Sequence, residues 1–343
     1  MTNGVVLSLA LADRHVSRRR PRLRRRAPEE EYLRGGGARR KGRDGRVQPQ
    51  GARGLGEAGE ALPRDAARAV RRRAVVTRRL LRAALAGGLV VLASGCGGRI
   101  VSQQIPVTFP RPATLTGDVY KPAGAGPFPA LVLLHGCSGV QPNTLAWAQW
   151  LQSEGYVALV LDSFSGRGLK RVCADSSPLT GGARAPDVFA AAQHLKTLPF
   201  VDGARLGAIG WSHGGWTVLQ SSRFENVHSD AGLKALIAFY PYCGDLAVYR
   251  SSTPLLMLLG ADDNWTPAEP CRYLAERARA DGRNVTAVVY PGAHHGFDGA
   301  HIARPTVIAD ARRGAGATVA YNPTAHADAE RRVKQFLAEA LRP

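Results

Sequence analysis

Ser212 is the residue of this sequence whose surroundings most clearly indicate chemistry. It stands in the motif Gly210-Trp211-Ser212-His213-Gly214, which fits the pattern G-x-S-x-G of a nucleophile elbow. In that arrangement a sharp turn between a strand and a helix exposes the serine, and the glycines let strand and helix approach without Cβ clashes. The N–H groups at the start of the helix then favour a developing oxyanion. Ser212 is therefore a candidate nucleophile; the alternative is a glycine-rich turn with an incidental serine.

A serine hydroxyl needs a base before it attacks a carbonyl carbon, and the chain offers candidates further on. With this elbow, the acid and the histidine of a catalytic triad follow the serine in that order. Asp262 and Asp263 follow the apolar run PLLMLLG, and His294 and His295 follow VVYPGA. A histidine would accept the Ser212 proton, and an aspartate would fix its tautomer and stabilise the imidazolium. Position along the chain leaves both members of each pair open.

A second conspicuous motif, HGCSG at residues 135–139, directly follows the apolar run FPALVLL. An oxyanion hole needs one backbone N–H from this loop and one from the residue after the nucleophile. We expect the N–H groups of Cys137 and His213 to fill these two positions. His135 is interpreted as a structural histidine that holds the turn rather than as a catalytic residue.

These candidates need strands and helices that bring them together, and the hydrophobic pattern predicts both. Eight segments read as strands, and the inner ones are continuous apolar runs, as expected for strands buried on both faces. Segments with helical periodicity lie between them and near the end of the chain. The alternation predicts an α/β fold, with a mostly parallel eight-stranded sheet covered by helices on both faces. Ligands of such sheets bind beyond the carboxyl ends of the strands, where Ser212 lies.

Six motifs together resemble the dienelactone hydrolase family of α/β-hydrolases over residues 106–343: HGCSG, DSFSGRG, GWSHGGW, FYPYC, LGADDNWTP and YPGAHHGFD. In that family the acid lies four residues before a proline, which corresponds to Asp263. The family histidine precedes a small residue and a phenylalanine, which corresponds to His295. The resemblance therefore implies a triad of Ser212, His295 and Asp263, with Asp262 and His294 as neighbours. The namesake enzymes use a cysteine nucleophile, so the serine here implies ordinary ester hydrolysis.

Other polar and aromatic residues near these motifs have mostly structural interpretations. Arg184 and Asp187 are expected to form a structural pair at the start of a helix. Asp162 and Arg167 are expected to order the loop that follows their strand. Trp265, two residues after the candidate acid, is a candidate for shaping an acyl or alcohol pocket.

The sequence thus predicts a serine hydrolase that cleaves carboxylic ester or lactone bonds through an acyl-enzyme intermediate. The expected partner is a small-molecule ester. No cofactor or metal is expected, because the sequence shows no glycine-rich phosphate loop and no metal-binding cluster. A peptidase or an acyltransferase with the same machinery is an alternative. A non-catalytic binding lipoprotein is an alternative of another class, although candidates for all three triad positions are present.

The chain contains five cysteines, of which four lie in the predicted catalytic domain: Cys137, Cys173, Cys243 and Cys271. An even number suits two disulfides in an oxidising compartment. The lack of C-x-x-C spacing argues against a metal site or a redox pair. The first two cysteines follow neighbouring strands, and so do the last two. We therefore predict the pairs Cys137–Cys173 and Cys243–Cys271; four reduced, buried cysteines are the alternative.

The basic charge is concentrated at the start of the chain. The formal net charge is +19, but residues 1–74 contain 20 Lys and Arg against 8 Asp and Glu, whereas residues 97–343 contain 23 against 19. The charge therefore does not predict that the folded domain binds nucleic acid. Residues 1–75 lack apolar periodicity and are expected to be a disordered, Arg- and Gly-rich leader. A nucleic-acid-binding arm and an untranslated stretch are the alternatives.

Residues 76–95 have the pattern of a signal peptide. Three arginines precede the short apolar run AALAGGLVVLA, and small residues lead up to Cys96. The segment resembles a bacterial lipoprotein signal, which implies a lipidated Cys96 and a single domain, residues 96–343, held at a membrane of the cell envelope. An ordinary signal peptide and a buried apolar helix are the alternatives. Because signal peptides begin a chain, we expect translation to start just before this segment, although no methionine lies between the first residue and Met257.

Overall fold

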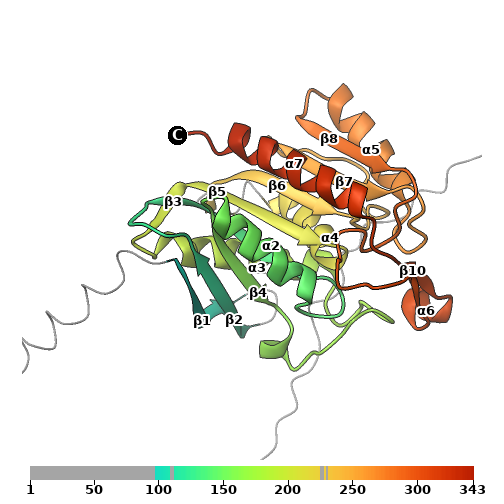
Figure 1. Ribbon diagram of the computed structural model, residues 1–343, viewed down its shortest axis with the longest axis horizontal. Coiled ribbons are helices and arrows are strands. Elements are labelled where there is room, and N and C mark those ends of the chain that lie inside the picture. The colour runs from blue at the N-terminus through green and yellow to red at the C-terminus, as the bar shows by residue number, and fades with distance from the viewer. Residues whose placement is uncertain (1–96, 109–111, 225–227, 229–230) are drawn as a thin grey trace, which may run out of the picture. The chain divides into compact units, whose positions relative to one another are not determined.

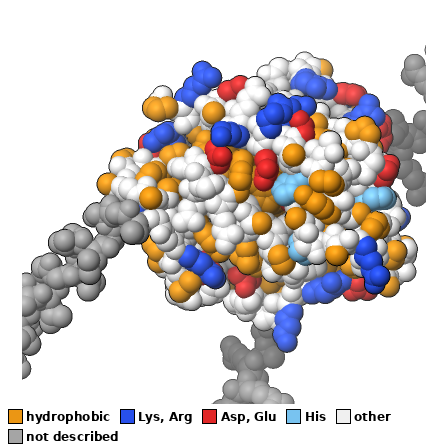
Figure 2. All heavy atoms as spheres, viewed as in Figure 1, with side chains coloured by type: hydrophobic (Ala, Val, Ile, Leu, Met, Phe, Trp, Pro, Cys, Tyr) orange, Lys and Arg blue, Asp and Glu red, His pale blue; other side chains and the backbone are white. Residues whose placement is uncertain are grey.

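The computed structural model describes residues 97–108, 112–224, 228 and 231–343. The predicted leader, the predicted signal segment and Cys96 lie outside the described residues. Within the described part of the chain, no helix combines the length and the apolar character that crossing a bilayer requires. On the face in Figure 2, Lys and Arg side chains are interspersed with Asp and Glu, as the nearly balanced charge of this region leads one to expect.

Eight strands form one twisted sheet in the order β1-β2-β4-β3-β5-β6-β7-β8 (Figure 1). Their bounds are β1 (Gly98–Val107), β2 (Ala113–Lys121), β3 (Phe128–Leu134), β4 (Val157–Asp162), β5 (Val201–Trp211), β6 (Leu233–Phe239), β7 (Leu255–Gly260) and β8 (Val285–Tyr290). The strand β2 pairs antiparallel with both β1 and β4, and the six strands from β4 to β8 in the sheet are parallel. This arrangement confirms the predicted fold class.

Helices cover both faces of the sheet, as Figure 1 shows. One face carries α3 (Gly181–Lys196), α4 (His213–Ser221) and α5 (Ala268–Ala280), and the other carries α2 (Pro142–Ser153) and α7 (Pro323–Ala340). Successive side chains of a strand point to opposite faces, so the buried strands supply both cores. In β3, for example, Val132 packs in the core under α3 and α4, whereas Leu133 packs in the core under α2 and α7.

The helix α3 begins earlier than its sequence suggests. Proline favours the first turn of a helix, so the sequence by itself indicates a start at Pro186. The helix instead begins at Gly181, after Thr180. The Thr180 hydroxyl accepts a hydrogen bond from the Ala183 N–H at 3.2 Å and so caps the helix. The early start adds a turn before Pro186, and Arg184 lies on this turn.

A small hairpin between β8 and α7 has no counterpart among the predicted elements. It consists of β9 (Thr306–Ile308), the short turn α6 (Ala311–Gly314) and β10 (Ala317–Val319). Strands of three residues are too short to show the alternation on which prediction depends. The short 3-10 turns η1 (Ser165–Arg167) and η2 (Ser222–Phe224) complete the elements.

Candidate active site

Ser212 occupies a strained turn between β5 and α4. Its φ of 53° and ψ of −112° lie outside the regions that residues with a side chain normally adopt. The turn is possible because glycines flank it: a Cβ on Gly210 would lie 2.2 Å from the Gly214 carbonyl oxygen, and a Cβ on Gly214 would lie 2.0 Å from the Leu134 oxygen. Neither position accepts a side chain without movement of the backbone. The glycines of the motif therefore create the sharp corner that presents the serine.

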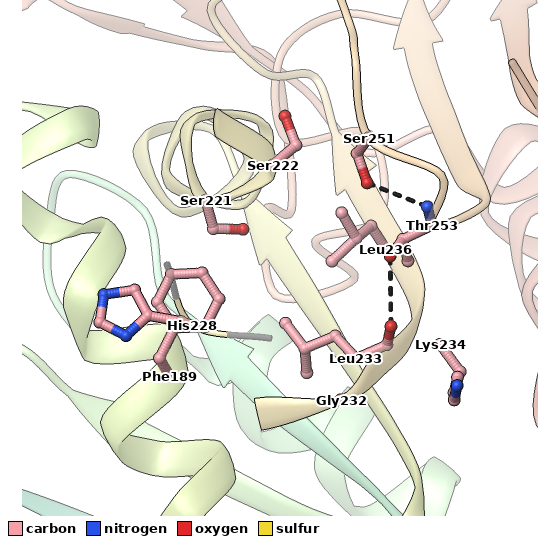
Figure 3. Close-up of a pocket in the computed structure, with 10 residues that line it drawn as sticks. All are labelled: Phe189, Ser221, Ser222, His228, Gly232, Leu233, Lys234, Leu236, Ser251 and Thr253. Carbon is pink, nitrogen blue, oxygen red and sulfur yellow. Dashed lines mark hydrogen bonds between the residues drawn. The ribbon is translucent and has the colours of Figure 1, made fainter. Parts of the chain in front are cut away.

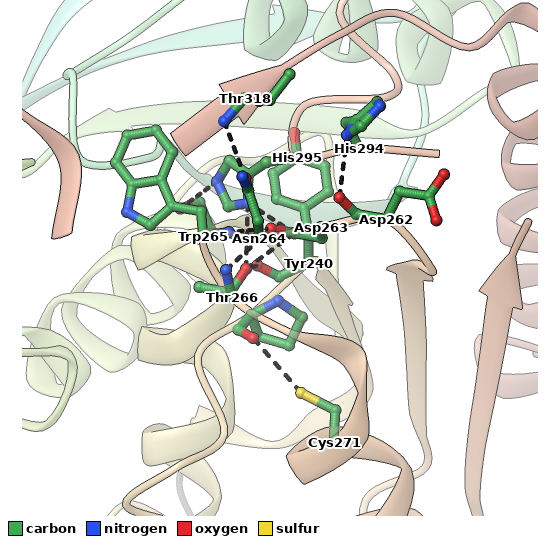
Figure 4. A network of polar contacts seen from close by, with 12 residues as sticks. Tyr240, Asp262, Asp263, Asn264, Trp265, Thr266, Cys271, His294, His295 and Thr318 are labelled. Carbon is green, nitrogen blue, oxygen red and sulfur yellow. Dashed lines mark hydrogen bonds and ion pairs between the residues drawn. The ribbon is translucent and has the colours of Figure 1, made fainter. Parts of the chain in front are cut away.

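The structure joins Ser212, His295 and Asp263 through hydrogen bonds. The His295 Nε2 lies 2.9 Å from the Ser212 Oγ, and the His295 Nδ1 lies 2.8 Å from an Asp263 carboxylate oxygen. Asp263 follows β7 and His295 follows β8, so both come from the carboxyl end of the sheet. Figure 4 shows the contact between these two side chains. With the Nδ1–H directed to the carboxylate, Nε2 is free to accept the serine proton.

The surroundings of Asp263 keep its carboxylate charged and oriented. One oxygen accepts hydrogen bonds from the Trp265 and Thr266 N–H groups at 2.8 and 2.9 Å, and the Thr266 hydroxyl lies 3.0 Å from the other. Burial by itself would raise the pKa of Asp263. The attraction and hydrogen bond of His295, together with the two N–H groups, outweigh this effect and hold the pKa below its ordinary value.

Two aromatic rings flank the His295 imidazole. The Tyr240 ring lies 4.5 Å from it and the Trp265 ring 4.8 Å, measured between centroids. Trp265 thus packs against the histidine and also lines the hollow above Ser212. The two contacts limit rotation of the imidazole, so its Nε2 stays directed at the serine.

The second aspartate and histidine of the two loops lie elsewhere. Asp262 is exposed, and the His294 Nδ1 donates to the Asp262 backbone carbonyl at 3.0 Å (Figure 4). Neither side chain has a hydrogen bond to Ser212 within the described part of the chain. Of the two candidates at each position, the structure thus brings Asp263 and His295 to the serine.

The segments with the two predicted oxyanion donors border the Ser212 side chain. A Cβ on Gly136 would lie 3.7 Å from the Ser212 Cβ, and the next residue, Cys137, lines the same hollow as the serine. His213 is the first residue of α4, where an N–H has no partner inside the helix. Both segments that were predicted to carry the oxyanion donors thus lie next to Ser212.

Both predicted disulfides are present. Cys137 is joined to Cys173 with a Cα–Cα distance of 4.9 Å, and Cys243 is joined to Cys271 with a distance of 5.2 Å. The first bond ties the loop after β3 to the loop after β4. The second ties the segment after β6 to the start of α5, four residues beyond Pro267 of the Asp263 loop.

The expected pair of Arg184 and Asp187 is not formed. The Asp187 carboxylate instead receives two hydrogen bonds from Arg167, at 2.7 and 2.8 Å. The Arg184 Nη1 donates to the His135 carbonyl at 2.9 Å and lies 3.1 Å from the His213 Nδ1. The early start of α3 explains the difference, because it turns Arg184 toward the active-site loops. Asp162 accepts the N–H groups of the loop residues that follow it, as expected.

His135 is buried and serves the loop, as predicted. Its Nδ1 lies 2.7 Å from the Gly136 carbonyl oxygen, and its Nε2 accepts the Ser163 N–H at 3.3 Å. Burial, followed by the charge of Arg184, holds its pKa well below the ordinary value. A neutral histidine with both nitrogens engaged is a structural element rather than a proton carrier.

Two hollows meet at Ser212. The first, of about 470 Å³, we call the histidine-side hollow, because His295 lines it together with the apolar residues Ile302, Ile308 and Val319. The hairpin of β9 and β10 and the segment before it thus form one wall. The second, of about 490 Å³, we call the arginine-side hollow; its lining includes Asp175, His213, Trp216, Asp245, Arg312 and Arg313.

A separate hollow of about 150 Å³ lies at the opposite end of the sheet, where β6 begins (Figure 3). The Ser221 and Ser222 hydroxyls at its wall donate to carbonyls of their own helix, at 2.7 and 2.6 Å. The His228 ring stacks on Phe189 with centroids 4.4 Å apart. The two serine hydroxyls of this hollow are thus engaged by their own helix. Parallel sheets bind ligands at the opposite end, beyond the carboxyl ends of the strands. We therefore assign the site to the hollows around Ser212.

A buried carboxylate beneath the site was not anticipated from the sequence. Asp298 accepts hydrogen bonds from the indole N–H groups of Trp147 and Trp211, at 2.9 and 2.8 Å, and from the Tyr240 hydroxyl at 2.6 Å. Asp298 therefore fixes the Tyr240 ring, which flanks His295. The donors come from distant segments, so no local pattern signals the cluster.

Among the described residues, no group of three or more His, Cys, Asp or Glu side chains is arranged to hold a metal ion.

Comparison with known proteins adds the family to this geometry. A family model described as the dienelactone hydrolase family matches residues 115–341. A putative carboxymethylenebutenolidase of Methylorubrum extorquens is 27% identical over 195 residues, which are 51% of this chain and 65% of that protein. The chain thus spans less than two thirds of the length of this curated relative.

Solved structures with the same fold include members of that family and esterases. A dienelactone hydrolase-like promiscuous phosphotriesterase from metagenomic libraries has a TM-score of 0.58 at 22% identity, over 72% of this chain and 100% of that one. Esterase 2 of Thermogutta terrifontis, phosphonylated by cyclosarin, has a TM-score of 0.50 at 20% identity, over 71% and 96%. At these identities the likeness shows the fold alone. Because the family model spans the elbow, both site loops and all four paired cysteines, the chain belongs to the dienelactone hydrolase family.

Proposed function

We propose that this protein is a serine hydrolase that cleaves carboxylic ester or lactone bonds through an acyl-enzyme. One observation carries the proposal: a continuous hydrogen-bond chain runs from the Ser212 hydroxyl through His295 to Asp263 at the junction of two hollows. Each group has the chemistry that its position requires. The serine is a nucleophile, the imidazole is a base and the buried carboxylate orients that base.

In the first half of the reaction, His295 accepts the Ser212 proton at Nε2 while the Ser212 Oγ attacks the ester carbonyl carbon. The carbonyl oxygen becomes an oxyanion, which the N–H groups of Cys137 and His213 stabilise. Asp263 stabilises the imidazolium by accepting its Nδ1–H. The imidazolium then gives its Nε2 proton to the leaving oxygen, and the C–O bond breaks.

In the second half, a water molecule replaces the alcohol. His295 accepts a proton from the water, the hydroxide attacks the acyl carbon, and a second oxyanion forms against the same N–H groups. Collapse of this intermediate returns the proton to the Ser212 Oγ and releases the carboxylic acid. The same groups thus serve both halves of the cycle.

The direction of proton transfer indicates which part of the substrate each hollow would hold. The leaving oxygen must lie within reach of the His295 Nε2, so the alcohol occupies the histidine-side hollow, which His295 lines. The acyl group then extends into the arginine-side hollow, which includes Arg312 and Arg313. The apolar wall of the first hollow favours an apolar alcohol, and the mixed charges of the second favour a polar acyl group.

Steady-state hydrolysis of chromogenic esters tests this proposal. The wild-type protein should hydrolyse p-nitrophenyl esters much faster than the p-nitroanilides of the same acids. The anilides serve as the comparison because a peptidase cleaves amide bonds, which are harder to cleave than ester bonds. Ser212→Ala should abolish both activities. Faster cleavage of the anilides would favour the peptidase, and full ester hydrolysis by Ser212→Ala would refute the mechanism.

We also propose that the domain is held at a membrane outside the cytoplasm by lipidated Cys96. The two disulfides support this proposal, because such bonds persist mainly in oxidising compartments. In a bacterial host the protein should fractionate with membranes, and Cys96→Ser should release it or leave an unprocessed precursor. A soluble wild-type protein that carries peptides from residues 1–74 would contradict both the anchor and the late translation start.

A further inference from the structure

Arg184 is a buried cation that no step of the proposed reaction uses. Its side chain is fully buried in α3, and within the described residues no hydrogen bond or ion pair joins it to a carboxylate. Its Nε and Nη2 have no hydrogen-bond partner there either. The ring of Phe164 lies under the guanidinium, 5.1 Å from its central carbon. The carboxylates of Asp187 and Asp162 attract the guanidinium from a distance, but burial has the larger effect and lowers its pKa.

One atom of Arg184, Nη1, contacts both segments that carry the proposed oxyanion donors. It donates to the His135 carbonyl at 2.9 Å, one peptide unit before the peptide that contains the Cys137 N–H. It also lies 3.1 Å from the Nδ1 of His213, whose own backbone N–H is the other donor. One rigid group thus fixes the loop after β3 relative to the first residue of α4.

The direction of each hydrogen bond in this bridge is determined. The His213 Nε2 donates to the Leu179 carbonyl at 2.8 Å, which leaves Nδ1 as an acceptor for Arg184. Burial, followed by the charge of Arg184, lowers the pKa of His213 to about 3, so the ring is neutral at neutral pH. Burial also lowers the pKa of Arg184, but only to about 10, so the guanidinium stays charged. At neutral pH the charged guanidinium therefore donates to a neutral imidazole.

We propose that Arg184 is a positioning residue for the oxyanion hole: it holds the Cys137 and His213 N–H groups in a fixed relation and places a positive charge behind them. The proposal rests on the proposed function, because the oxyanion exists only if Ser212 attacks a carbonyl group. Arg184 contacts neither the serine nor the histidine of the triad, so it acts through the two loops. Its effect should appear in the transition state and not in substrate binding.

Kinetics of Arg184→Gln test the proposal. The loss of one direct oxyanion donor costs about 10²- to 10³-fold in kcat, so the loss of a residue that positions two donors should lower kcat by about 10- to 100-fold. KM should change by less than about threefold. The affinity for a trifluoromethyl ketone, which Ser212 converts into an oxyanion adduct, should fall by the same factor as kcat. Arg184→Lys, which keeps the charge but not the planar fork, should lose less.

A matched control separates positioning from general loss of structure. Arg167 and Asp187 form another buried ionic group on the same side of the sheet, and among the described residues no hydrogen bond joins either to an oxyanion segment. Asp187 attracts the Arg184 guanidinium and Arg167 repels it, so removing both charges together removes two opposite effects on Arg184. The double variant Arg167→Met/Asp187→Leu removes both charges together, so neither is left unpaired. It should retain kcat within about threefold even if its melting temperature changes. An equal loss of kcat in this control and in Arg184→Gln would overturn the positioning role.

A double-mutant cycle with His213→Ala gives a second measurement. This change removes the ring that Arg184 contacts and keeps the backbone N–H. If the two residues act as a unit, the double variant with Arg184→Gln should lose little more activity than either single variant. If Arg184→Gln does not fold, Arg184→Lys takes its place in the cycle. Full additivity, or an effect on KM alone, would contradict the proposal.

The Ser212→Ala variant distinguishes failure of this inference from failure of the proposed function. An inactive Ser212→Ala together with a fully active Arg184→Gln would overturn only the role of Arg184. A fully active Ser212→Ala would overturn the hydrolase mechanism, and the oxyanion hole with it.

Discussion

Two Asp–His pairs lie side by side in the loops after β7 and β8, and they differ in what their side chains reach. Asp263 and His295 are buried, and hydrogen bonds join them to Ser212. Asp262 is exposed, and the His294 ring donates to the Asp262 backbone carbonyl. The outer pair still joins the two loops, because the Asp262 N–H donates to the Ala293 carbonyl at 3.0 Å. The two pairs have the same residue types and lie in the same loops. They differ because one side chain in each loop points toward Ser212 and the other does not.

The histidines should give the largest contrast. His295→Ala removes the base and should lower kcat by about 10⁴- to 10⁶-fold, as in other serine hydrolases with a disabled triad. His294→Ala removes one hydrogen bond to a backbone carbonyl and should retain kcat within about fivefold. Ester hydrolysis under saturating substrate measures both. Similar losses in the two variants would mean that the inner and outer histidines are not functionally distinct.

The aspartates should give a smaller contrast of the same kind. Asp263→Asn keeps the shape of the side chain but favours the wrong His295 tautomer, which should lower kcat by about 10⁴-fold. Asp262→Asn should be nearly silent, since the hydrogen bond from His294 goes to the backbone carbonyl. A large loss in Asp262→Asn would show that the outer pair takes part in catalysis.

The two disulfides extend the comparison from side chains to the loops that carry them. They close segments with sequence separations of 36 and 28 residues, so each should contribute about 3 to 4 kcal/mol to the free energy of unfolding. Replacing Cys137 and Cys173 by serine should also lower kcat, because we propose that the Cys137 N–H belongs to the oxyanion hole. Replacing Cys243 and Cys271 should reduce stability with a smaller effect on kcat. Chemical denaturation and kinetics of the two double variants measure both effects, and equal kcat values would argue against a role of the first disulfide in the oxyanion hole.

Acid stability should give the smallest contrast. The pKa of Asp263 in the folded protein is lower than its ordinary value of 3.8, so its charged form stabilises the fold. This contribution is complete above about pH 5 and is lost as the pH falls through the ordinary value toward the folded pKa. Asp263→Asn should therefore flatten the decline of melting temperature with acid, compared with the wild type. Parallel curves for wild type and Asp263→Asn would contradict this.

The main features of the fold follow from the sequence because they depend on local patterns. Continuous apolar runs predict buried parallel strands, and the resulting order of loops at the carboxyl end of the sheet led to both disulfide pairs. The hairpin of β9 and β10 escaped prediction because its strands have three residues each. It nevertheless forms a wall of the histidine-side hollow, so the shape of the pocket could not be predicted.

The candidate site was predictable where chemistry depends on a motif and not where it depends on distant contacts. Ser212 could be identified because its glycines are required by the turn. The partners of Arg184 could not, because the start of α3 is set by the Thr180 cap, and the helix pattern pointed to Pro186. The indole donors to Asp298 likewise come from separate elements, and no spacing in the sequence reports such a contact.

Covalent labelling of Ser212 tests the central claim most directly. A fluorophosphonate reacts with a serine only where a base activates it and an oxyanion hole receives the phosphonyl oxygen. Intact-mass measurement of the protein after labelling should show one adduct, and peptide mapping should place it on Ser212. Labelling should be lost in Ser212→Ala and His295→Ala and retained in His294→Ala. An adduct on another residue, or labelling that persists in Ser212→Ala, would contradict the account.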